Sequence, residues 1–152
     1  MSIWQGLLGK LGLLDTAAHS RSAIRVFVLD DDESRHDWFG TRFPGAQLDI
    51  AVEPLRAVEL LKNYFYDAVF LDHDLLPEHY KSSALDDERT GYAVALWLAE
   101  HPNMQRAATI IVHTRNADGA MRMVEEMRRA GRQAEYVPFP LLAQKIKHYW
   151  QR

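Results

Sequence analysis

The chain has 152 residues, a length that suits one domain with a sizeable hydrophobic core. Hydrophobic residues make up 47% of it and the formal net charge is −3, which is ordinary for a globular protein and gives no electrostatic reason to expect binding to duplex DNA. It contains no cysteine, which excludes disulfides and thiolate metal sites and is compatible with a cytoplasmic location.

The first 22 residues are expected to form an extension with one amphipathic helix, ahead of a single domain over residues 23–152. The glycines at positions 6, 9 and 12 each cost such a helix about 1 kcal/mol relative to alanine, so it needs a surface to lie on. That surface is its own domain, a second copy of the chain or a protein partner. The segment has no basic start and is too short to span a bilayer, so membrane contact is the less favoured alternative. The apolar residues at helical spacing are Ile3, Trp4, Leu7, Leu8, Leu11 and Leu14.

From residue 24 onward, short apolar runs alternate with helical patterns. Strands are predicted at 24–29, 47–52, 67–71, 109–113 and 134–138, and helices at 33–42, 54–64, 90–101, 117–130 and 141–150. Pro54 takes a first-turn position, and Gly131 follows the end of a helix. The first, third and fourth strands are nearly continuous in apolar residues, as central parallel strands are. The sequence therefore predicts an α/β fold: a doubly wound five-stranded parallel sheet with helices on both faces.

Polar residues collect where three of these strands end. In an open α/β sheet, ligands bind outside the carboxyl ends of the strands, at the point where the strand order reverses. The second and fifth strands end in comparatively bland residues. The first strand is followed by Asp30, Asp31, Asp32 and Arg35, the third by Asp72, His73 and Asp74, and the fourth by His113, Thr114, Arg115 and Asn116.

So many carboxylates at one edge repel one another unless a cation balances them. A divalent ion held by Asp31 and Asp72, with Asp30 and Asp74 as further ligands, is the simplest solution. Oxygen ligands favour Mg²⁺ or Mn²⁺, and added imidazole shifts the preference toward Mn²⁺, Fe²⁺ or Zn²⁺. Asp32 has a structural alternative, because aspartate at this position often caps the following helix.

This pattern resembles the receiver domain of two-component signalling. Asp30 and Asp31 match the acidic pair of that family, and Asp72 matches its phosphoacceptor. Two positions depart from it. Val137 stands where receivers have a lysine before the proline, and the hydroxyl position holds His113, or Thr114 one place late. The segment 78–89 is an insertion, either a lid or substrate loop or plain surface decoration.

The motifs are more similar to a variant, the cyclic-phosphate-processing receiver family. They are Leu29–Asp32 with Arg35, Leu71–Leu75, Thr90-Gly91 and His113–Asn116. This resemblance implies a flavodoxin-like, receiver-like (βα)5 fold with an extra N-terminal helix. It also implies processing of a cyclic phosphate on a nucleotide or an RNA end.

Hydrolysis of a cyclic phosphodiester needs an activated water, a neutralised phosphate and an acid for the leaving oxygen. We expect Asp72, His73, His113 and Asn116 to be catalytic, and Arg35, Thr114 and Arg115 to bind the phosphate. His36 and His79 are expected to be surface histidines, and 86–88 a solvated charge run. The competing class is a non-catalytic receiver or adaptor with Asp72 as phosphoacceptor, and a third reading is a phosphate-ligand sensor without turnover.

Overall fold

The computed structural model of the chain describes residues 23–75 and 88–150. Three features expected from the sequence lie outside the described residues. They are the N-terminal extension 1–22, most of the insertion 78–89, and His79 within that insertion.

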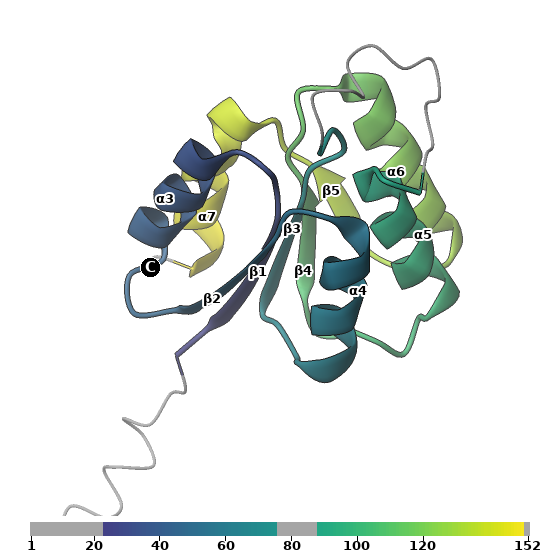
Figure 1. Cartoon of the computed structure of the whole chain (residues 1–152), viewed down its shortest axis with the longest axis horizontal. Helices are drawn as coiled ribbons and strands as arrows, with labels where there is room; N and C mark the ends of the chain where they lie inside the picture. Colours follow the sequence, from purple (N-terminus) through teal and green to yellow (C-terminus); the bar gives the residue numbers. More distant parts are fainter. Residues whose placement is uncertain (1–22, 76–87, 151–152) are drawn as a thin grey trace, which may run out of the picture.

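Within the described residues the chain forms one five-stranded parallel sheet in the order β2-β1-β3-β4-β5 (Figure 1). β1 therefore lies between β2 and β3, and the direction of winding reverses between β1 and β3. The predicted doubly wound α/β sheet is confirmed. Its elements are β1 (Arg25–Leu29), α3 (Glu33–Arg42), β2 (Gln47–Ala51), α4 (Pro54–Asn63), β3 (Ala68–Leu71), α5 (Gly91–Glu100), β4 (Thr109–Val112), α6 (Ala117–Arg129), β5 (Ala134–Tyr136), the 3-10 turn η2 (Phe139–Leu141) and α7 (Leu142–Trp150).

Two helical layers cover the sheet, α3 and α7 on one face and α4, α5 and α6 on the other (Figure 1). Side chains alternate between the faces along each strand, as the pleat requires. Val28 and Phe70 pack with Phe39 of α3, whereas Leu29 and Leu71 pack toward α4, α5 and α6. This alternation decides which way the residue after each strand points.

The helices begin and end where the sequence signals place them. The side chain of Asp32 accepts hydrogen bonds from the backbone N–H groups of Ser34 (2.9 Å) and Arg35 (3.2 Å), so its predicted capping role is confirmed. Pro54 opens α4, and Gly131 follows α6 with φ +82°. No helix in the ranges 23–75 and 88–150 has the length and apolar character needed to cross a membrane.

Candidate functional site

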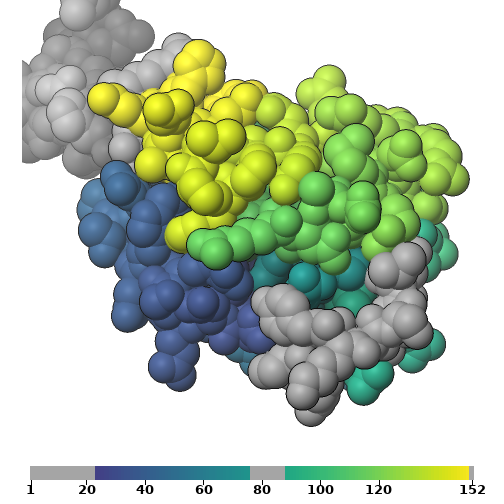
Figure 2. Space-filling view, turned by 90° about the horizontal axis from the view of Figure 1, so that it is seen from above, coloured from purple at the N-terminus to yellow at the C-terminus, as the bar shows by residue number. Residues whose placement is uncertain are grey.

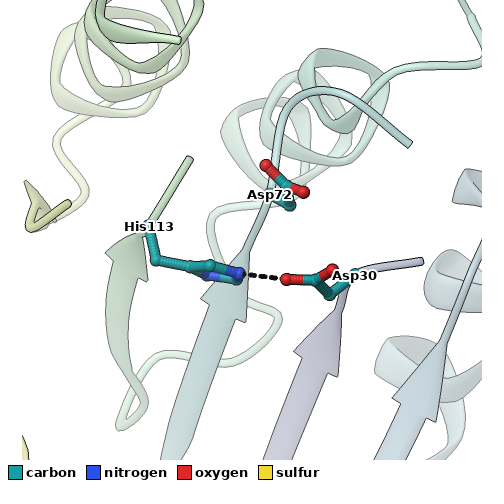
Figure 3. A group of neighbouring side chains, drawn as sticks. All are labelled: Asp30, Asp72 and His113. Atoms are coloured by element: carbon teal, nitrogen blue, oxygen red, sulfur yellow. Dashed lines mark hydrogen bonds and ion pairs between the residues drawn. The ribbon is translucent and has the colours of Figure 1, made fainter. Parts of the chain in front are cut away.

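The residues that follow β1, β3 and β4 form one buried group. Leu29, Leu71 and Val112 lie in register as the last residues of these strands, and all three point into the α4, α5 and α6 face. The next residue of each strand is therefore on the opposite face. These residues are Asp30, Asp72 and His113, and Figure 3 shows the His113 and Asp30 side chains pointing toward each other with Asp72 beside them. One potential ligand atom from each lies within 4.8 Å of the others.

Asp30 is fully buried and fully paired. Its Oδ2 accepts hydrogen bonds from His113 Nε2 (2.7 Å) and Arg35 Nε (2.7 Å). Its Oδ1 accepts from Arg35 Nη2 (2.8 Å) and the backbone N–H of Asp32 (2.9 Å). Burial alone would raise the pKa of Asp30, but the hydrogen bonds from His113 and Arg35 outweigh it and lower the pKa from 3.8 to about 2. The Asp30 side chain is thus held as a carboxylate.

Arg35 joins the carboxylates that follow β1 and β3. Besides binding Asp30, its Nη2 donates to Asp72 Oδ2 at 3.0 Å. Its guanidinium carbon also lies 5.8 Å from the ring centre of Phe139, just after β5. The position of the receiver lysine holds the apolar Val137, so α3 rather than the end of β5 supplies the cation at these carboxylates.

Asp72 is 4% exposed. Its Oδ1 accepts from the backbone N–H of His73 (2.8 Å), and the Thr114 hydroxyl also donates to the carboxylate. Burial raises the pKa of Asp72, His113 opposes that shift, and the charge of Asp30 adds to it. Of the two sequence alternatives for the receiver hydroxyl, Thr114 is the residue that contacts Asp72.

His113 is committed to Asp30 and otherwise surrounded by aromatic rings. Because a carboxylate oxygen accepts, Nε2 carries the hydrogen and donates it. Nδ1 is buried and, within the described part of the chain, has no hydrogen-bond partner. The imidazole centre lies 5.5 Å from the Phe39 ring centre and 6.4 Å from that of Phe70. His113 therefore fixes the orientation of the Asp30 carboxylate.

A second polar group lies on the other face of the sheet edge, beside α6. His73 follows Asp72, so its side chain points away from the first group. His73 Nδ1 lies 2.7 Å from Asp74 Oδ1, and Asn116 Nδ2 lies 3.3 Å from the same oxygen. Gly119, a residue that the sequence motifs do not mark, packs against the His73 ring. Its only sequence signal is a glycine inside the first turn of a predicted helix.

The remaining expected site residues are placed as follows. Asp31 is partly buried, and burial together with the charge of Asp30 raises its pKa. Arg115 is exposed at the start of the β4–α6 loop. His36, expected to be a surface histidine, is partly buried and contacts the site, because its Nε2 lies 2.6 Å from the Asp30 carbonyl oxygen. Figure 2 looks onto this edge, with the β1–α3 region in purple and blue beside the green β4–α6 region.

The donor set fits a divalent cation. Asp30, Asp31 and Asp72 bring three carboxylates to the edge, and the Arg35 guanidinium balances only one unit of their charge. The raised pKa values of Asp31 and Asp72 have the same origin, because burial and like charge both disfavour the ionised form. Carboxylate oxygens suit Mg²⁺ or Mn²⁺ best, with Zn²⁺ and Fe²⁺ as alternatives.

Solved structures similar to this one are receiver domains. A CheY-like receiver domain protein from Methanospirillum hungatei superposes with a TM-score of 0.59 at 20% identity, covering 84% of this chain and 93% of the other. CheY4 of Vibrio cholerae gives a TM-score of 0.61 at 14% identity, covering 86% and 98%. The Mn²⁺-bound form of response regulator Rcp1 gives 0.59 at 15% identity, covering 84% and 94%. At these identities the likeness establishes the receiver fold.

The family is established by the sequence itself. No match is found among curated proteins. The model of the cyclic-phosphate processing receiver domain matches residues 24–129, which span all of the site described above. The chain therefore belongs to the family of cyclic-phosphate-processing receiver domains.

Proposed function

We propose that this protein is a metal-dependent phosphoester-processing enzyme that hydrolyses a cyclic phosphate on a nucleotide or an RNA end. The observation that carries the proposal is the buried group of Asp30, Asp72 and His113, bridged by Arg35 at the switch point of the sheet. A switch point is where open α/β sheets bind ligands. Membership of the cyclic-phosphate-processing family supports the substrate class.

A divalent cation, Mg²⁺ or Mn²⁺ in the first instance, supplies charge neutralisation on the phosphate and an activated water when bound. Asp31 and Asp72 are its proposed main ligands, with Asp30 close by. The Mn²⁺-bound receiver Rcp1 supports a cation on this fold. Asp74 was expected as a further ligand, but its Oδ1 faces His73 and Asn116, so we assign it to orienting the imidazole.

The phosphate is bound by cationic and hydroxyl groups of the same edge. Arg35 presents a planar fork of N–H donors, which matches two phosphate oxygens, and its bond to Asp72 Oδ2 is the one that a phosphate oxygen replaces. Thr114 donates a hydrogen bond beside it. Arg115 is exposed on the following loop and binds the outer phosphate oxygens or the nucleotide.

Proton transfer is assigned to His73. Water attacks phosphorus and gives one proton to Nε2 of the neutral His73 ring, the bond from phosphorus to one oxygen of the cyclic phosphate breaks, and that oxygen leaves as an alcohol after receiving a proton. His73 passes the proton that Nε2 has accepted from the water to this oxygen, with its ring held by Asp74 and with Asn116 beside it. His113 acts through Asp30, because its Nε2 is already bound there.

The alternative function is a non-catalytic receiver in signalling, with Asp72 as phosphoacceptor. The hydrogen bond from Thr114 to Asp72 favours it, since receivers have a hydroxyl residue at this place. The ion pair of Arg35 with Asp72 and the absence of a lysine at Val137 count against it. A sensor that binds the phosphate without turnover would use the same residues.

A substrate panel tests the proposal. Purified protein is incubated with 2′,3′- and 3′,5′-cyclic nucleotides and with RNA ending in a 2′,3′-cyclic phosphate, each with Mg²⁺ and with Mn²⁺. We expect hydrolysis of at least one substrate, a loss of about 10²–10³-fold in kcat for Asp72→Asn, and no loss for the exposed control Asp37→Asn. If all substrates stay intact while acetyl phosphate labels Asp72, the signalling receiver is the correct function.

A further inference from the structure

The His73 imidazole packs against Gly119, in the first turn of α6. It is 3% exposed and lies on the face of the sheet edge opposite to Asp72. Its Nδ1 is 2.7 Å from Asp74 Oδ1, and because a carboxylate oxygen can only accept, Nδ1 carries the hydrogen and donates it. In this tautomer of the neutral ring, Nε2 carries the lone pair.

Asn116 links this pair to the helix. Its Oδ1 accepts from the Gly119 backbone N–H at 2.9 Å and so caps α6. Its Nδ2 donates to Asp74 Oδ1 at 3.3 Å. The same Nδ2 lies 3.5 Å from His73 Nδ1, which is an approach of two donors and therefore a packing contact. One amide thus ties the start of α6 to the oxygen that His73 binds.

The absence of a side chain on Gly119 leaves the space that the His73 ring occupies. A Cβ on Gly119 would lie 2.7 Å from both Cγ and Cδ2 of the His73 ring and 3.0 Å from Asn116 Nδ2, closer than carbon atoms approach. Glycine weakens a helix relative to alanine, so its presence in the first turn needs another reason. A Cβ on Gly40 in α3 would have no neighbouring atom within 4 Å, so alanine at position 40 causes no clash.

We propose that Gly119, together with Asn116, is a positioning residue that fixes the orientation of the His73 imidazole. Without a side chain at position 119, the ring packs against the start of α6 and its Nδ1 faces Asp74. With a methyl group there, the ring must turn or move away, and the hydrogen bond to Asp74 is lost. The catalytic use of the ring rests on the proposed function, whereas its orientation does not.

The test compares Gly119→Ala with Gly40→Ala, which makes the same chemical change without a clash. The first readout is the pair of ¹⁵N signals of the His73 ring at one fixed pH, which report the tautomer and the Nδ1 hydrogen bond. We expect both signals to move in Gly119→Ala and to stay in Gly40→Ala, while circular dichroism shows both proteins folded. The second readout is kinetic, with kcat lower by about 100-fold, the cost of displacing a reacting group by about 1 Å.

Unchanged His73 signals in folded Gly119→Ala overturn the proposal. If Gly119→Ala does not fold, the test uses Asn116→Ser, because serine keeps a helix cap but lacks the amide that binds Asp74. A movement of the His73 signals in Asn116→Ser supports the proposal, and unmoved signals overturn it. A failure of the proposed function gives a different pattern. In that case wild-type protein hydrolyses no cyclic phosphate, and the signals of His73 still move in Gly119→Ala.

Discussion

Arg35 Nη2 lies 3.0 Å from Asp72 Oδ2, so a side chain from α3 is paired with the carboxylate that follows β3. The same guanidinium binds both oxygens of Asp30. It thereby spans the reversal point of the sheet and places a permanent positive charge among the carboxylates. Any metal ion or phosphate that binds here shares these oxygens with Arg35 or replaces one of its contacts.

The first prediction concerns the stability contributed by Arg35. Arg35→Gln leaves Asp30, which is 0% exposed, without its cation. Removing one partner of a buried ion pair costs about 3–5 kcal/mol, because the remaining charge is stranded in a low-dielectric site. Urea denaturation should therefore show a loss in the free energy of unfolding within that range.

The control for this variant is Arg56→Gln. Arg56 pairs with Glu59 at 2.9 Å, a distance like that to Asp72, but the two side chains are 52% and 61% exposed. Exposed pairs contribute about 0–1 kcal/mol. Equal losses in the two variants would show that the Arg35 cluster is no more than a surface ion pair.

The second prediction is a dependence of stability on pH that belongs to Asp30. Its pKa is lowered from 3.8 to about 2 in the folded protein, so between these values the unfolded chain binds more protons. The carboxylate therefore contributes stability that is fully present above about pH 4 and is lost as the pH falls through about 2. At about 1.4 kcal/mol per pKa unit, the contribution is on the order of 2 kcal/mol.

Denaturation series from pH 5 to pH 2 should show a steeper acid limb in wild-type protein than in Asp30→Asn. The comparison of slopes matters, because burial raises the pKa of Asp72 and its protonation favours the folded state on acidification. Parallel limbs in the two proteins would mean that Asp30 titrates normally.

The fold was predictable because its signals are local. Apolar runs marked β1, β3 and β4 as central strands, and Asp32, Pro54 and Gly131 marked helix ends. The limits of the other strands and of the helices differ from the prediction by at most one residue, and that of β5 differs by two. The prediction reached residue 138, whereas β5 ends at Tyr136, since Pro138 has no N–H to donate to a ladder.

The pairing within the site was less predictable, because it depends on three-dimensional distances. The strand-end rule brought the correct residues to one edge, but the spacing in sequence could not show that Arg35 would reach Asp72. Nor could it separate the two faces, which place His113 with Asp30 and His73 with Asp74. The close packing of Gly119 on His73 has no sequence signature beyond the glycine itself.

The third prediction concerns Gly91, where α5 begins. Its N–H donates to the His73 carbonyl at 2.9 Å, and a Cβ at this residue would overlap the carbonyl oxygen of Asp72. The clash involves backbone atoms, so a rotamer change cannot relieve it. Gly91→Ala should destabilise the protein by about 3 kcal/mol or more, since the start of α5 must shift.

Gly40→Ala, in open space, should instead be neutral or stabilising by about 0.5–1 kcal/mol through helix propensity. Thermal unfolding of the two variants beside wild type measures both effects. A Gly91→Ala protein as stable as wild type would show that α5 is not held against the end of β3 in solution.

The fourth prediction is that divalent metal stabilises the protein, and that Arg35 limits the effect. A ligand that binds only the folded state adds about 2.7 kcal/mol at a concentration 100 times its Kd. Thermal unfolding with Mg²⁺, Mn²⁺ and Zn²⁺ should therefore show a rise in Tm that EDTA reverses. Asp72→Asn should reduce the rise, because it removes one carboxylate from the group of Asp30, Asp72 and His113.

Arg35→Gln should bind metal more tightly than wild type, although it is less stable without metal. The substitution removes the cation that competes for Asp30 and Asp72, so the metal ion meets less competing positive charge at these carboxylates. Its rise in Tm at a given Mn²⁺ concentration should exceed that of wild type, while Arg56→Gln should match wild type. A smaller rise in Arg35→Gln would mean that the guanidinium orients the carboxylates for the ion, and no rise in any protein would mean that these carboxylates hold no metal.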